Sequence, residues 1–70
     1  MSQFNSIASR NIRQAITTQN TNNHAVSRKT GISYTTLNRK LESGGFTLDD
    51  LERIADALDV EPIALLKDAA

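Results

Sequence analysis

The sequence contains no cysteine, which excludes disulfide bonds and thiolate metal sites as sources of stability. Its 70 residues have room for a single domain, and a chain of this size hides only about 60% of its unfolded surface on folding. Stability must therefore come from the packing of a modest core or from a partner. We treat residues 1–70 as one domain, and the lack of cysteine fits a reducing compartment.

Long apolar segments are also missing. The longest uninterrupted apolar run, residues 63–66, is far shorter than the roughly 20 residues that a membrane span requires. No charged-then-apolar leader opens the chain. We therefore expect a soluble, cytoplasmic protein, associated with the nucleoid in a bacterial host.

The chain has no net charge, because eight basic and eight acidic residues cancel. The two parts of the chain nevertheless differ. Residues 1–41 carry six basic residues and no acidic one (+6), whereas residues 42–70 carry two basic and eight acidic residues (−6). Such an asymmetry indicates that the basic part of the chain faces a polyanion. The alternative is that the basic and acidic residues cluster by chance on two solvated faces. The six basic residues are Arg10, Arg13, Arg28, Lys29, Arg39 and Lys40.

Apolar residues at spacings of three and four along residues 3–18 predict an amphipathic helix with one buried face. They are Phe4, Ile7, Ala8, Ile12, Ala15 and Ile16. The wholly polar residues 19–23 predict a loop that ends in a helix cap, which is either Asn22 or Asn23.

A second, shorter helix is expected over residues 24–30, with Ala25 and Val26 facing inward. Gly31 ends it, because a residue just past a helix end commonly adopts the left-handed conformation, which costs glycine little.

A third helix is expected over residues 34–43, with Ser33 as its N-cap. Leu37 and Leu41 lie four residues apart and mark its inward face. The opposite face is polar and consists of Thr35, Asn38, Arg39 and Glu42.

A fourth helix should follow Gly44 and Gly45, capped by Thr47 with acidic residues in its first turn. Its apolar stripe is Leu48, Leu51, Ile54, Ala55 and Leu58. Pro62 suits the first position of a short fifth helix that contains residues 63–66. The sequence shows no strand, repeat or low-complexity tract, so we expect an all-α, compact bundle of about five short helices.

Two short helices joined by a short turn that contains glycine form the arrangement that places the second helix in the DNA major groove. Residues 23–42 have this layout. The sequence resembles the Cro and lambda-repressor-like helix-turn-helix family in residues 27–33 at the turn, in Leu37 and Leu41, and in residues 51–60. The resemblance covers roughly residues 23–66.

The resemblance implies that the helix over residues 34–43 reads bases and that the start of the second helix grips a phosphate. The chain departs from the family at three positions. Asn23 and His24 stand where the family often has glutamine, and Ser27 stands where it often has alanine. Asparagine and histidine can still donate to phosphate, and serine fits a close helix crossing if its hydroxyl finds a backbone carbonyl.

The first turns of a recognition helix point their side chains at base edges, and the candidate base readers are Tyr34, Thr35, Asn38 and Arg39. Tyr34 offers a ring for a thymine methyl group, but it shares the face of Leu37 and its alternative role is half-buried packing. Asn38 can bridge adenine with its side-chain amide. The alternative for Thr35 and Asn38 is that both are ordinary polar residues of the surface. Arg39 either forks onto guanine or holds a phosphate.

The candidate phosphate ligands fix register without reading sequence. They are Asn22, Asn23, His24, Arg28, Lys29, Ser33, Thr36, Lys40 and Ser43, with Arg10 and Arg13 as more remote candidates. Which of the residues 22–24 makes the contact stays open, and Arg28 and Lys29 are alternatively solvated charges.

No catalytic constellation is present, so we expect no enzyme, no cofactor and no small-molecule substrate. His24 is the sole histidine and has no cysteine or histidine partner for a metal. The adjacent Asp49 and Asp50 do not face each other on a helix, and complementing the helix dipole explains both.

We expect a sequence-specific repressor that binds a double-stranded DNA operator, of the kind found in phage Cro-like switches. The alternative is an interaction module, for example an antitoxin-like regulator whose acidic C-terminal half binds a basic partner. We expect a monomer or weak homodimer that pairs on DNA. Leu65, Ala69 and Ala70 are the candidate apolar contacts of that dimer, while Val60, Ile63 and Leu66 fit the core.

Overall fold

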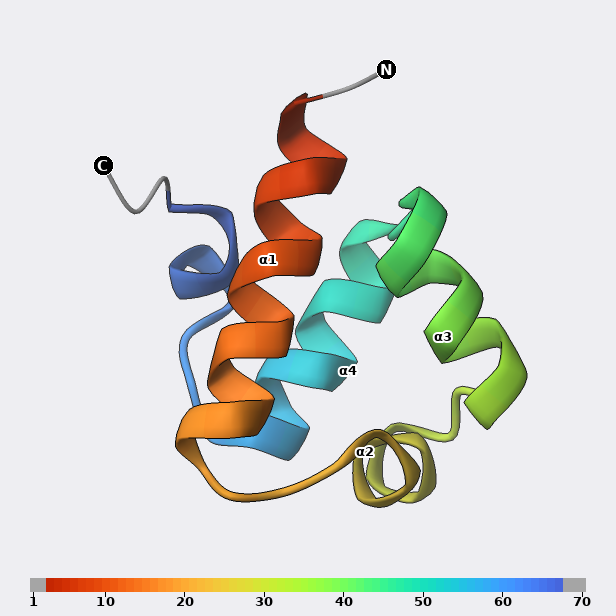
Figure 1. Ribbon diagram of the computed structural model, residues 1–70. Coiled ribbons are helices and arrows are strands. Elements are labelled where there is room, and N and C mark those ends of the chain that lie inside the picture. Colours follow the sequence, from red (N-terminus) through yellow and green to blue (C-terminus); the bar gives the residue numbers. More distant parts are fainter. Residues whose placement is uncertain (1–2, 68–70) are drawn as a thin grey trace.

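In the computed structural model, which describes the backbone of residues 3–67 and the side chains of residues 6–67, the chain forms four α-helices and a 3-10 turn (Figure 1). They are α1 (Gln3–Thr18), α2 (Asn23–Thr30), α3 (Tyr34–Ser43), α4 (Leu48–Leu58) and η1 (Pro62–Leu66). The prediction of an all-α bundle is confirmed. Its last element is a 3-10 turn rather than a fifth α-helix. None of the helices within the described range combines the length and apolarity needed to cross a membrane.

Helix α1 lies at the centre of the arrangement. It contacts α3, α4 and η1, while α2 packs against α3 and α4. In Figure 1, α2 and α3 lie on one side of α1 and η1 lies on the other. The fold therefore separates the helix-turn-helix from the C-terminal turn.

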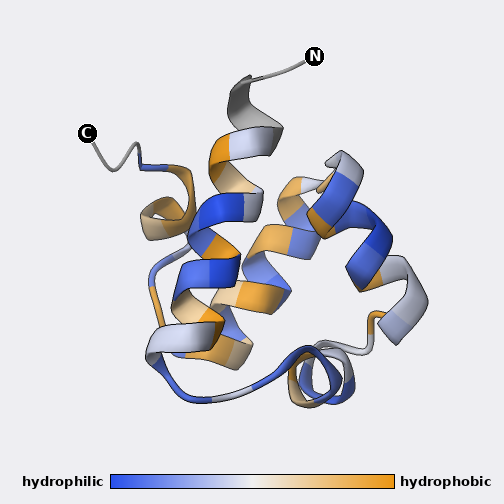
Figure 2. Cartoon of the chain, viewed as in Figure 1, coloured by the Kyte–Doolittle hydropathy of each residue, from blue (hydrophilic) through white to orange (hydrophobic). Residues whose placement is uncertain are grey.

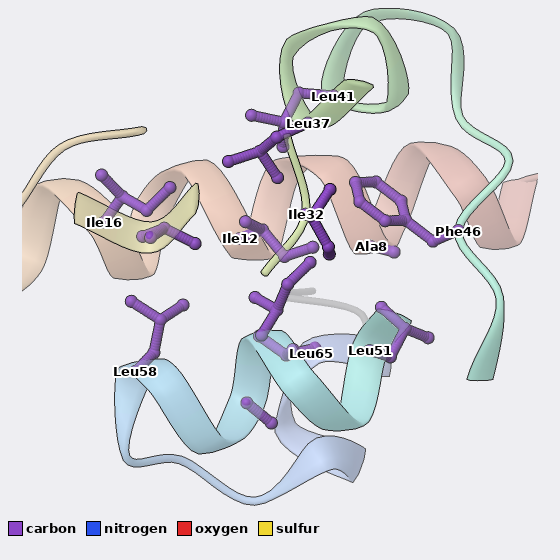
Figure 3. Close-up of a cluster of buried hydrophobic side chains, with 13 residues drawn as sticks. Ala8, Ile12, Ile16, Ile32, Leu37, Leu41, Phe46, Leu51, Leu58 and Leu65 are labelled. Atoms are coloured by element: carbon purple, nitrogen blue, oxygen red, sulfur yellow. The ribbon is translucent and has the colours of Figure 1, made fainter. Parts of the chain in front are cut away.

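The core draws on every element and on two connecting segments (Figure 3). Ile32 and Phe46 are buried although they lie between helices, and both belong to the same cluster as the apolar residues of α1. The periodicity of the helices could not predict these two residues. The buried apolar residues are Ala8, Ile12, Ile16, Val26, Ile32, Leu37, Leu41, Phe46, Leu51, Ile54, Ala55, Leu58 and Leu65. The predicted core residue Phe4 has its side chain outside the described part.

Three predictions about apolar side chains were wrong. Leu48 was expected in the core but is 72% exposed. It is the first residue of α4, and because helical side chains lean toward the N-terminus, its side chain projects past the start of the helix and away from the turns that pack on the core. Ile63 was expected in the core and is 64% exposed. Leu65 was a candidate dimer contact, but it is 2% exposed. Because the 3-10 turn repeats every three residues, Leu65 takes the inward position and Ile63 faces away. Ala69 and Ala70 lie outside the described residues.

Local capping fixes the ends of α2 and α3. The side chain of Asn22 accepts a hydrogen bond from the amide of Ala25 at 2.9 Å, so Asn22 is the cap and α2 begins at Asn23. Gly31 ends α2 with φ +80°, a conformation that suits glycine. The hydroxyl of Ser33 accepts from the amide of Thr36 at 3.2 Å and thereby starts α3.

The turn between α2 and α3 is held by two hydroxyl groups. Ser27 donates to the carbonyl oxygen of Ile32, which is the kind of partner that a serine at this crossing needs. Thr30 is buried, donates to the carbonyl of Val26 at 2.8 Å and accepts from the amide of Ile32 at 3.1 Å. These bonds satisfy the turn's buried polar groups and set the angle between the two helices.

Candidate nucleic-acid interface

The first turn of α2 contacts the first turns of α3, and together they expose a polar face. Tyr34, Thr35 and Arg39 are exposed on α3, and Asn38 is half-buried between them and α2. Figure 2 shows that most of α3 is hydrophilic, as its inward face holds only Leu37 and Leu41. We call this region the α2–α3 polar surface; it consists of Asn23, His24, Tyr34, Thr35, Asn38 and Arg39.

A hydrogen bond joins the two helices within the α2–α3 polar surface. The side-chain amide of Asn23 donates to Oδ1 of Asn38 at 2.8 Å. The Nδ2 group of Asn38 is left to donate outward, and its carbonyl oxygen keeps a second lone pair. A candidate phosphate ligand thus orients a candidate base reader, and both polar groups of Asn38 remain able to face an adenine.

A ring stack forms a second link between the helices. The rings of His24 and Tyr34 lie 3.7 Å apart at an interplanar angle of 3°. Tyr34 is 41% exposed, so it rests on His24 at the surface rather than in the core beside Leu37. The stack holds the phenol ring at the protruding end of α3.

His24→Ala should disturb this surface while leaving the fold intact. The exposed stack is worth about 0.5–1.5 kcal/mol, which is enough to release Tyr34 but small against the stability of the domain. Because Tyr34 is the only tyrosine and the chain has no tryptophan, its fluorescence reports on this site alone. We expect a changed tyrosine emission and an unchanged far-ultraviolet circular dichroism spectrum. Identical emission from both proteins would contradict the stack.

Other candidate residues surround the α2–α3 polar surface. Arg28 and Lys29 are exposed in the last turn of α2. Ser33 donates to the hydroxyl of Thr36 at 2.8 Å, which leaves the proton of Thr36 for an outside acceptor. Ser43 donates to the carbonyl of Arg39 at 2.8 Å.

The predicted candidates Asn22, Arg10 and Arg13 differ in their position. Asn22 uses its side-chain oxygen to cap α2, and its amide nitrogen is the group that can still donate to a ligand. Arg10 and Arg13 are exposed on α1 and so project from neither helix of the helix-turn-helix.

Lys40 has a structural role that the sequence did not predict. Its ammonium group forms an ion pair with Asp50 of α4, and the two side chains are only 19% and 14% exposed. Asp50 also accepts from the amide of Thr47 at 3.0 Å and completes the capping box of α4. The structure thus directs Lys40 to the junction of α3 and α4 and does not support it as a phosphate ligand.

The Asp50 carboxylate makes stability depend on acid pH. Burial alone would raise the pKa of Asp50, but hydrogen bonds from Lys40 and Thr47 outweigh burial and hold the pKa below the ordinary aspartate value. Stabilisation by a carboxylate with a lowered pKa is complete above about pH 4 and is lost as the pH falls through the folded-state value.

Asp50→Asn should therefore lower the free energy of unfolding by about 1–2 kcal/mol at neutral pH, through loss of the ion pair and a weaker hydrogen bond from the amide of Thr47. The difference from the parent protein should shrink as the pH falls below about 4 and through the lowered pKa of the folded parent, where its carboxylate also becomes protonated. Urea denaturation at neutral and acid pH measures both values. A pH-independent difference would argue against the ionised pair.

Family comparison agrees with this geometry. Residues 11–69 match the family described as the Cro/C1-type HTH DNA-binding domain. The chain belongs to the Cro/C1-type HTH DNA-binding family. The match includes α2, α3, α4 and η1 and the second half of α1, which is more of the chain than the resemblance seen in the sequence. No curated protein and no solved structure matches the chain.

Membership of the Cro/C1-type family identifies the chain as a DNA-binding domain rather than an enzyme. The helix-turn-helix is the part formed by α2, the Gly31 turn and α3. Every residue of the α2–α3 polar surface was predicted as a base reader or phosphate ligand. The two pairings, Asn23 with Asn38 and His24 with Tyr34, were not predicted. The available signal was that a helix-turn-helix brings the first turns of both helices together.

Proposed function

We propose that the protein is a sequence-specific transcriptional repressor of the Cro-like type, with α3 inserted in the major groove of an operator. The observation that supports this most directly is the α2–α3 polar surface. Its outward side chains come from the first turns of α3, which are the turns that meet base edges in this docking mode. Two links from α2 hold Asn38 and Tyr34 in place before DNA arrives.

The proposed base readers have distinct chemistry. Asn38 bridges the N6 and N7 positions of adenine, and Thr35 offers a hydroxyl group to either kind of base pair. Tyr34 places its ring against a thymine methyl group. Arg39, exposed one turn further along α3, forks onto guanine or holds the phosphate beside it.

The proposed phosphate ligands flank these residues on both helices. Those at the start of α2 donate side-chain N–H groups next to the positive end of its dipole, which favours an anion. The exposed cations at the end of α2 add charge that is independent of sequence. The proposed ligands are Asn22, Asn23, His24, Arg28, Lys29, Ser33, Thr36 and Ser43. Ser33 and Ser43 bind phosphate by redirecting the hydroxyl protons that otherwise bond Thr36 and the carbonyl of Arg39.

Repression follows from occupancy, because a protein seated on an operator blocks polymerase or a competing regulator. One domain covers one half-site, and members of this docking class pair on half-sites about one DNA turn apart. We propose a monomer or weak dimer that pairs on the operator, as in a phage switch.

Selection of bound duplexes from a random pool, followed by binding assays at several salt concentrations, tests the proposal. We expect one enriched motif, and log affinity should fall with log salt by about 0.9 for each phosphate neutralised. A promoter that carries the motif should lose expression when the protein is present. No enrichment, no duplex binding at about 50 mM salt, or activation of the promoter would contradict the proposal.

A further inference from the structure

An apolar groove lies on another part of the molecule, between the start of α4 and η1. It has a volume of about 360 Å³ and is lined by Leu48, Leu51, Glu52, Pro62, Ile63 and Leu66. Leu48 and Ile63 are mostly exposed, and among residues 6–67 the other large apolar side chain left exposed is Tyr34. Exposed apolar residues that gather in one groove mark an interaction site more often than scattered ones do.

One acidic residue lines the groove and two lie close to its lining residues along the chain, and we call these three its acidic rim. Glu52 lines the groove, Asp56 lies one turn further on the same face of α4, and Glu61 directly precedes η1. None of these three carboxylates has an ion-pair partner among the side chains of residues 6–67. Arg53 on α4 is already paired with Asp49 at 3.1 Å.

The charge balance of the whole segment agrees with that of the rim. Residues 48–67 contain six acidic and two basic residues, and the second basic residue, Lys67, follows the last residue of η1. A ligand in the groove therefore meets an apolar floor and a negative edge. This combination favours a ligand that is both apolar and cationic.

We propose that this groove binds an amphipathic segment of another protein, whose apolar side chains fill the groove and whose lysine or arginine residues pair with the acidic rim. A second copy of the chain fits poorly, because two acidic rims would face each other across a symmetric contact. None of the residues that line the groove belongs to the α2–α3 polar surface, so the partner and a duplex on α3 bind at the same time. The proposal does not depend on repression.

A synthetic helical peptide with leucine at alternate spacings of three and four and lysine elsewhere is a suitable probe, and the same peptide with glutamate for lysine is its control. The lysine peptide should shift the backbone amide resonances of the first turns of α4 and of η1 in the full chain. The glutamate peptide should not. Added salt should weaken the binding.

Substitutions locate the site. Leu48→Ser and Ile63→Ser, both at exposed positions, should each weaken the peptide about tenfold without altering the fold. Glu52→Lys should also weaken it, whereas Glu42→Lys, the same change on α3, should leave it unchanged. Duplex binding by the Leu48 and Ile63 variants should match that of the parent.

Several results would overturn the proposal. They are an absence of shifts with the lysine peptide, shifts centred away from α4 and η1, equal binding of the glutamate peptide, and equal loss in the Glu52 and Glu42 variants. Self-association that disappears in Leu48→Ser would make a second copy the occupant and would also overturn it.

Discussion

Leu37→Ala should lower the free energy of unfolding by about 2–5 kcal/mol, the largest loss that we expect from a single substitution outside the turns. Leu37 is fully buried, and Figure 3 shows it with Leu41 on the side of α3 that faces α1. A domain of this size has a total stability of roughly 4–10 kcal/mol. The variant should therefore be partly unfolded at room temperature, as measured by urea denaturation followed by circular dichroism.

Thr35→Ala is the matched control for this experiment. Thr35 lies two residues away on the same helix but is exposed, so its truncation should change stability by less than about 0.5 kcal/mol. The affinity of each variant for DNA is then corrected for its folded fraction. Thr35→Ala should bind DNA more weakly than the parent protein, whereas Leu37→Ala should bind as the parent does. Equal stability of Leu37→Ala and the parent would mean that α3 does not pack on the core as described.

Asn38→Ala should relax the preference at one base position, at a cost of about 1–3 kcal/mol on the selected duplex and little on random DNA. The reason is that Asn38 carries no charge and offers only its amide, which Asn23 holds in place. Competition assays with single-base variants of the selected duplex measure this effect.

Lys29→Ala is the appropriate comparison, because Lys29 is exposed near the end of α2 and carries a charge. It should weaken all duplexes alike and reduce the slope of log affinity against log salt by about 0.9. If Asn38→Ala and Lys29→Ala behave alike on selected and random DNA, the division into base readers and phosphate ligands is wrong.

The helix boundaries were largely predictable because local chemistry determines them. The predicted ranges 3–18 and 34–43 coincide with α1 and α3, and the caps at Ser33 and Thr47 are confirmed. α2 begins one residue earlier than predicted, because Asn22 rather than Asn23 supplies the capping oxygen. Each of these features depends on residues within one turn of each other.

Features that depend on tertiary packing were not predictable. Lys40 and Asp50 are ten residues apart on different helices, and only the angle between α3 and α4 brings them together. The exposure of Leu48 depends on whether another element packs against the first turn of α4, and the periodicity of the sequence does not contain this information. Ile32 and Phe46 are buried because the connecting segments cross the core.

The candidate site shows the same division. The polar outer face of α3 could be predicted from Thr35, Asn38 and Arg39 alone, since helical spacing puts them together. The positioning of Asn38 and Tyr34 by α2 depends on the turn angle, which the bonds of Ser27 and Thr30 set in three dimensions. The acidic composition after residue 41 was visible, but the groove that it borders was not.

Amide and side-chain resonance mapping with the selected duplex tests the central claim most directly. If α3 enters the major groove, the largest perturbations should fall on Thr35, Asn38 and Arg39 and on residues 22–24, with the ring signals of Tyr34 shifted as well. Perturbations centred on α4 and η1, or spread evenly over all exposed cations including those of α1, would contradict it.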